Sequence, residues 1–269
     1  MKPSKLFGNL YLAVILTLLY LPIAVIVVYS FSGNSNFSFS QGFTLEAYRS
    51  IFTSKQTPQL LAALKNTLII AAVSSVFATA LGTFSAVGIH ALSRRAKNAV
   101  MGVNQLPLIN SEIVMAVSLM IFFVNASFIP EGMTRLILSH ISFCTPYVVL
   151  SVMPKLVQMD PNLYEAAADL GANRFRTMSD VILPCIFPGV VSGFVMAFTI
   201  SLDDFIITQI NKGETGIETL STYIYEDARL KSLQPFWFAV FSIIFVVVLA
   251  VLLLINLRRT KPISSPAIH

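Results

Sequence analysis

The chain has 269 residues, of which 55% are hydrophobic and 12% are charged, with a mean hydropathy of +0.76 and a formal net charge of +5. Soluble domains carry about 25% charged residues, so this composition excludes a water-soluble globular protein and predicts an integral membrane protein. We interpret the basic residues as a signal of membrane orientation in preference to nucleic-acid binding, and the absence of Lys and Arg from the cores of the apolar runs favours a pathway for cations.

Six apolar runs are long enough to cross a membrane as helices. A spanning helix needs about 20 apolar residues, and the runs lie near residues 10–30, 65–89, 99–124, 134–153, 187–209 and 236–256. They are too long and too uniformly apolar for the strands of a membrane barrel, and a helix satisfies its own backbone hydrogen bonds in lipid. The sequence therefore predicts an all-α integral membrane protein with six transmembrane helices.

The distribution of lysine and arginine predicts the orientation, because cytoplasmic loops carry these residues in excess. If the N-terminus is cytoplasmic, eleven of the 18 Lys and Arg residues lie inside and seven lie outside. Both termini are therefore expected in the cytoplasm. In this arrangement residues 154–186, between the fourth and fifth helices, form the only long cytoplasmic loop.

This loop carries clear helix signals. Asp160 can cap a helix that has Pro161 at its first position and continues through helix formers to Leu170, and Gly171 provides a stop at its C-terminal end. Asn173 can cap a second short helix, which we expect to end before Leu183-Pro184. The first helix has small residues on its surface, so it can dock closely into a groove of another protein. An amphipathic helix that lies on the membrane surface is the alternative that this pattern leaves open.

The spacing of residues in this loop resembles a known signature. Glu165-Ala166-Ala167, three residues, Gly171, nine residues, an aliphatic residue, one residue and then Leu183-Pro184 is similar to the signature loop of binding-protein-dependent ABC importer permeases. The one departure is Val181, where that family usually has Ile. The resemblance implies a single transmembrane domain over 1–269, with its core at about 60–256, in the bacterial cytoplasmic (inner) membrane.

The resemblance also implies how the protein is driven. In that family the loop is a coupling helix that seats in a cleft of a cytoplasmic ATPase. By motif match, Glu165 would anchor the loop through charge-assisted hydrogen bonds, Ala166 and Ala167 would permit close approach, and Gly171 would set the angle between the two short helices. The implied partners are two ATPase subunits, a homologous permease subunit and an extracytoplasmic substrate-binding protein.

The sequence contains no catalytic or metal-binding motif that we can identify. It has no Gly-x-x-x-x-Gly-Lys-Ser/Thr loop for phosphates and no His pair at metal-ligand spacing. The two cysteines, Cys144 and Cys185, indicate neither a disulfide framework nor a metal site. We therefore expect a subunit that is not an enzyme and holds no cofactor, with ATP and magnesium bound by the partner ATPase.

Three acidic residues fall inside the apolar runs: Glu112, Asp203 and Asp204. An ionisable side chain in a spanning segment is costly, so each is a candidate for the substrate pathway. Pro107 can loosen the helix that carries Glu112. Adjacent helical residues point about 100° apart, so one of the two aspartates is expected to face the path. The structural alternatives are an ion pair with a neighbouring helix or, for the aspartates, a cap near the outer membrane face.

A narrower resemblance concerns the cargo. The stretches 112–119, 139–149, 165–171 and 201–205 together look like the second permease subunit of spermidine/putrescine importers. It implies a polyamine cargo, whose ammonium groups carboxylates can pair and whose methylene stem aromatic side chains can hold. A binding protein would dock chiefly on residues 31–64 and 210–235.

Other functions stay open from the sequence. Within the same class, the cargo could be another organic cation, an amino-acid derivative or ferric iron. In a different class, the chain could be a stand-alone secondary transporter, although we find no internal inverted repeat. A structural membrane scaffold would have little reason to keep three acids in lipid.

Overall fold

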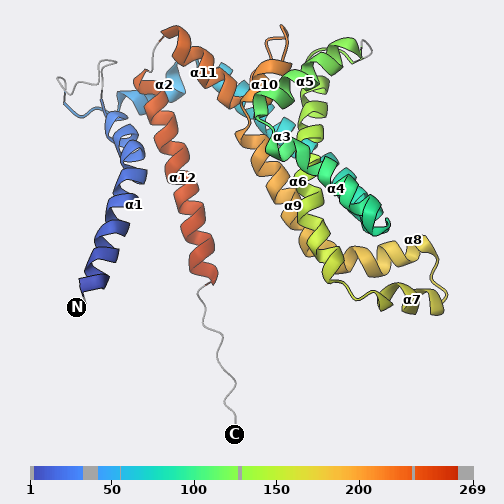
Figure 1. Ribbon diagram of the computed structural model, residues 1–269. Coiled ribbons are helices and arrows are strands. Elements are labelled where there is room, and N and C mark those ends of the chain that lie inside the picture. The colour runs from blue at the N-terminus through green and yellow to red at the C-terminus, as the bar shows by residue number, and fades with distance from the viewer. Residues whose placement is uncertain (1–2, 33–41, 55, 127–128, 232–233, 260–269) are drawn as a thin grey trace. The chain divides into compact units, whose positions relative to one another are not determined.

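The computed structural model describes residues 3–32, 42–54, 56–126, 129–231 and 234–259, and these are almost entirely helical (Figure 1). Within them the sole extended pairing is an isolated bridge between Ser32 and Phe43. The helices are α1 (Pro3–Tyr29), α2 (Glu46–Thr53), α3 (Thr57–His90), α4 (Arg94–Ile109), α5 (Glu112–Asn125), α6 (Met133–Gln158), α7 (Asn162–Asp169), α8 (Arg174–Arg176), the π-helical segment η1 (Thr177–Ile182), α9 (Leu183–Asp203), α10 (Ile206–Asn211), α11 (Leu220–Lys231) and α12 (Pro235–Arg259).

Four of the described helices are long and apolar enough to cross a membrane. They are Gly8–Tyr29, Thr57–His90, Met133–Gln158 and the continuous run Arg174–Asp203. Helices α4 and α5 together form a fifth candidate span if the two are counted as one. The helical membrane fold is thereby confirmed. The sixth span, for which α12 supplies a shorter apolar helix, and the cytoplasmic termini stay predictions.

The predicted span over 99–124 is two helices, as the loosening by Pro107 had suggested. The chain breaks at Asn110, and the axes of α4 and α5 differ by 106°. Pro107 has no N–H to donate to the carbonyl of Val103, which weakens the last turn of α4. Asn110 then adopts an extended backbone, and α5 begins afresh at Glu112.

The expected stop before Leu183-Pro184 is also wrong, because the helix runs on from Arg174 to Asp203. Pro184 cannot donate a hydrogen bond to the carbonyl of Asp180. The chain accommodates this by widening into the π-helical turns of η1, where the N–H of Leu183 donates to the carbonyl of Met178. A π-helical turn keeps the helix intact where an α-helical hydrogen bond is lost.

The chain forms two compact units, one made of Met1–Gln59 with Ile224–His269 and the other of Leu60–Tyr223. In the first unit α1 and α2 both pack on α12 (Figure 1). A buried Trp237 indole donates a 2.6 Å hydrogen bond to Asp227, which also accepts from Gln56 at 3.3 Å. This carboxylate thereby joins α11 and α12 to the segment between α2 and α3.

In the second unit, Val148 of α6 lies between two glycines. A Cβ placed on Gly82 of α3 would lie 2.6 Å from the Val148 Cβ, and one placed on Gly193 of α9 would lie 3.0 Å from its Cγ1. The completely buried Val148 therefore requires glycine on both neighbouring helices. These contacts fix how closely the three apolar helices approach one another.

We predict that Gly82→Ala lowers the stability of the purified complex, whereas Gly88→Ala on the same helix does not. Overpacking costs about 1–3 kcal/mol, which outweighs the gain of up to about 1 kcal/mol in helix propensity. A Cβ on Gly88 would meet nothing within 4 Å, so that variant keeps only the gain. Thermal unfolding in detergent measures both; equal midpoints for the two variants would contradict the packing described.

Candidate functional site

The predicted coupling loop is built by local hydrogen bonds. The carboxylate of Asp160 accepts from the N–H of Asn162 at 2.9 Å where α7 begins. At the other end the N–H of Gly171 donates to the carbonyl of Ala168, and the N–H of Ala172 donates to the carbonyl of Ala167. These two bonds form a Schellman motif, which requires a left-handed residue at Gly171, where φ is +78°. The predicted start and stop of this helix are confirmed.

The second predicted cap is also present. The side chain of Asn173 accepts a 2.9 Å hydrogen bond from the N–H of Arg176, where α8 begins. The two helical segments are thus separated by a short turn centred on Gly171. The loop leaves α6 and enters the long helix of α8, η1 and α9 (Figure 1).

The residues of the signature differ in their exposure to solvent. Glu165 and Ala166 are exposed, whereas Ala167 is the buried residue of α7, which packs on η1. Among the described residues we find no hydrogen bond or ion pair for Glu165. The alanine at 167 therefore serves the packing of the loop on its own chain, while Glu165 and Ala166 are free to contact another protein.

Two large apolar side chains also project from this loop. Leu170 is 88% exposed and Phe175 is 80% exposed. Neither was singled out from the sequence. The available signal was an aromatic residue between Arg174 and Arg176, directly after the cap at Asn173. Exposed apolar groups beside cations are typical of a protein-binding surface.

Glu112 and Asp203 occupy comparable places at helix breaks. Glu112 is the exposed first residue of α5, and Asp203 is the exposed last residue of α9. In the described part of the chain we find no ion pair for either. The helix dipole stabilises a carboxylate at an N-terminus and destabilises one at a C-terminus. Asp203 therefore stands where local structure disfavours an anion, so a bound cation would stabilise it.

Asp204 is placed differently from Asp203. The predicted run 187–209 does not continue as one helix, because Asp204 is extended and α10 starts at Ile206. Its buried carboxylate accepts from the N–H groups of Ile207 at 3.0 Å and Thr208 at 2.9 Å. It therefore caps α10, and it also lies 3.5 Å from Nε2 of His140.

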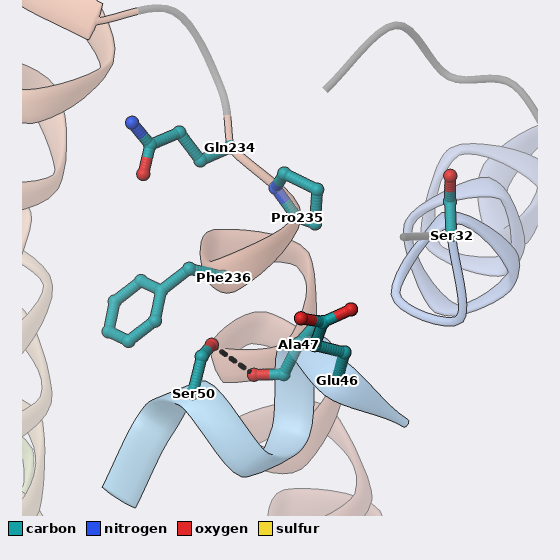
Figure 2. Close-up of a pocket in the computed structure, with 7 residues that line it drawn as sticks. All are labelled: Ser32, Glu46, Ala47, Ser50, Gln234, Pro235 and Phe236. Carbon is teal, nitrogen blue, oxygen red and sulfur yellow. Dashed lines mark hydrogen bonds between the residues drawn. The ribbon is translucent and has the colours of Figure 1, made fainter. Parts of the chain in front are cut away.

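A separate pocket of about 200 Å³ lies in the first unit, between α2 and the start of α12 (Figure 2). It is lined by Ser32, Glu46, Ala47, Ser50, Gln234, Pro235 and Phe236. The Ser50 hydroxyl donates to the carbonyl of Ala47 at 2.7 Å. The exposed Glu46 is the one charged residue among those that line the pocket. Six of these seven residues fall in the two segments predicted to dock a binding protein.

Comparison with known proteins identifies the family. Residues 78–260 match the family described as binding-protein-dependent transport system inner membrane component. The chain belongs to this family. The matched residues include the loop signature and the three acids, so the resemblance drawn from those residues is confirmed.

Several relatives of this permease are named. The spermidine/putrescine transport system permease protein PotC of Escherichia coli (strain K12) is 34% identical over 228 residues, which cover 84% of each chain. PotC of Haemophilus influenzae is 32% identical over 253 residues, covering 94% of the permease and 96% of the relative. The resemblance to the second permease subunit of spermidine/putrescine importers is likewise confirmed.

A solved structure shows the same fold. It is a bacterial ABC transporter involved in the import of the acidic polysaccharide alginate, with a TM-score of 0.67 at 21% identity over 96% of both chains. At this identity the likeness concerns the fold alone. The permease therefore carries the architecture of an ABC importer subunit, and its own residues must decide the cargo.

We predict that Gly171→Ala loosens the coupling loop, because a side chain at φ +78° strains the backbone by about 1–2 kcal/mol. Amide hydrogen exchange in α7 should rise at least about fivefold. Gly171→Asn should have a smaller effect, since Asn tolerates the left-handed conformation. Gly102→Ala on α4, where a Cβ also meets nothing within 4 Å, is the control. Unchanged exchange in Gly171→Ala would contradict the Schellman stop.

Proposed function

We propose that this permease is the transmembrane subunit of an ATP-driven importer that carries polyamines, such as spermidine and putrescine, into the cytoplasm by alternating access. The observation that carries the proposal is the exposed Asp203 at the C-terminal end of α9, in a helix that has no other charged residue. The last carbonyls of a helix and a carboxylate beside them attract a cation together. The names of the relatives support the polyamine.

Glu112 supplies a second carboxylate for the same path. It lies within electrostatic reach of Tyr147 on α6, whose ring packs edge-on against Phe143 at a centroid distance of 5.7 Å. Carboxylates pair with ammonium groups, and aromatic faces attract cations and cover methylene groups. A flexible polycation can therefore be held weakly at several points and released, as transport requires.

The energy for transport enters through the coupling loop. Glu165 and Ala166 would contact a cytoplasmic ATPase, with Leu170 and Phe175 as apolar contacts at the rim. Gly171 would keep the two helical segments at a fixed angle. Two copies of that ATPase would bind ATP and magnesium. The movement of these two subunits as they close would be transmitted to the continuous helix from Arg174 to Asp203.

The remaining partners follow from the topology. The permease would have six transmembrane helices with cytoplasmic termini in the bacterial inner membrane, and it would pair with a homologous permease subunit. A substrate-binding protein would dock outside on residues 31–64 and 210–235. The pocket beside α2 offers Glu46 to a cationic side chain of that protein (Figure 2).

Other cargoes fit less well. An importer of oxyanions needs cationic side chains along its path, and Glu112 and Asp203 have the opposite charge. Another organic cation, an amino-acid derivative or ferric iron would also meet these carboxylates, so uptake assays must compare them with polyamines. A stand-alone secondary transporter would have no use for an ATPase-docking loop.

We predict that Glu112→Gln and Asp203→Asn each lower ATP-dependent uptake of labelled spermidine at least about tenfold in vesicles that contain the full complex. Each substitution keeps the shape of the side chain and removes its charge, and one charge-assisted pair is worth about 1.5–3 kcal/mol. Asp160→Asn is the control, because Asn caps a helix as well as Asp does. Normal uptake in both variants would remove these residues from the path.

We also predict that Glu165→Ala abolishes uptake while the variant complex still binds the loaded binding protein. The substitution removes the exposed charge of the loop and keeps a residue that favours helix. Stimulation of ATP hydrolysis by the loaded binding protein measures the coupling. Uptake that proceeds without any ATPase subunit would contradict the importer proposal as a whole.

A further inference from the structure

The short helix α10 is buried and fastened at both ends. Of its residues, Ile207, Thr208 and Asn211 are completely buried. It begins two residues after the end of α9 at Asp203, with Asp204 and Phe205 between them, and it packs on α5, which begins with Glu112, and on α6 (Figure 1). It therefore connects the two helix ends that carry the carboxylates of the proposed path.

The first fastening is a hydrogen-bonded cluster at the start of α10. The Thr208 hydroxyl donates to Oδ2 of Asp204 at 2.8 Å. Nε2 of His140 lies 3.1 Å from the same hydroxyl oxygen. Since the Thr208 proton is already used, His140 is the donor in this contact. His140 thus hydrogen-bonds Thr208 and lies beside the carboxylate of Asp204, which caps the helix.

The cluster continues through the other side of the imidazole. Nδ1 of His140 lies 2.7 Å from the Ser201 hydroxyl, which lies 3.0 Å from that of Ser74. The Ser74 hydroxyl donates to the carbonyl of Ile70 at 2.5 Å. These buried groups join α3, α6, α9 and α10. Buried polar networks of this kind fix one arrangement, because breaking any contact leaves an unsatisfied group.

The second fastening is at the end of α10. Nδ2 of Asn211 donates to the carbonyl of Ala116 on α5 at 3.1 Å and to that of Ile207 at 3.0 Å. Ala116 lies one helical turn after Glu112. The amide of Asn211 therefore ties α10 to the same turn of α5 that carries the Glu112 carboxylate.

We propose that α10, held by His140 and Thr208 at one end and by Asn211 at the other, fixes the spacing between the carboxylates of Asp203 and Glu112. This inference rests on the proposed function. A fixed spacing favours the polyamine whose ammonium groups match it and disfavours one that is a methylene longer. His140, Thr208 and Asn211 are positioning residues that do not touch the cargo, and together they set the selectivity among polyamines.

The test compares ATP-dependent uptake of putrescine and cadaverine, two diamines that differ by one methylene, in vesicles containing the full complex. We expect the wild-type complex to distinguish the two by about tenfold in kcat/KM, the lower end of what one methylene contributes. Thr208→Val and Asn211→Ala, which loosen opposite ends of α10, should each reduce this ratio to about threefold or less. Either variant suffices if the other fails to assemble.

The controls separate positioning from general damage. Thr208→Ser keeps the hydroxyl and should keep the wild-type ratio, as should His90→Gln, whose imidazole contacts Lys97 outside this cluster. A variant pair that slows both diamines equally, or a wild-type complex that does not distinguish them, would overturn the inference and leave polyamine import standing. A wild-type complex that transports neither diamine nor spermidine would overturn polyamine import itself.

Discussion

The buried carboxylate of Asp204 needs hydrogen-bond donors inside an apolar helical bundle, and the donors that it finds determine where the helices around it begin and end. It accepts from the first N–H groups of α10, so α9 must end one residue earlier, at Asp203. His140 completes the cluster from α6, and Ser201 and Ser74 extend it to α3. One buried carboxyl group thus accounts for a helix break, a short helix and the exposed position of its neighbour.

The coupling loop and the acidic residues of the proposed path are two separate candidate regions. The coupling loop is held by local bonds and exposes Glu165, Leu170 and Phe175, which suits contact with another protein. The acids stand at helix breaks elsewhere in the same compact unit. The continuous helix from Arg174 to Asp203 joins the turn after Gly171 to the end of α9, so the proposed displacement of the loop would be carried along one unbroken helix toward the carboxylate.

Features set by neighbouring residues were predictable from the sequence, and those set by distant residues were not. Asp160, Gly171 and Asn173 act within a few residues of themselves, and each was found as predicted. The sequence had marked Pro107 as loosening the helix over 99–124, but the break at Asn110 and the 106° change of axis were not predicted. Which of the two aspartates is buried involves His140, which lies more than sixty positions away in the sequence. A capping role was the alternative that the sequence had left open for the aspartates.

The most direct test of a cation path is the reactivity of a cysteine at Thr199, which is exposed one turn before Asp203. With Cys185→Ser as background, Thr199→Cys in the full complex is treated with cationic and anionic methanethiosulfonate reagents of equal size. The account predicts faster reaction with the cationic reagent, protection by spermidine, and loss of the preference when Asp203→Asn is added. Equal rates for both reagents, unaffected by spermidine, would contradict it.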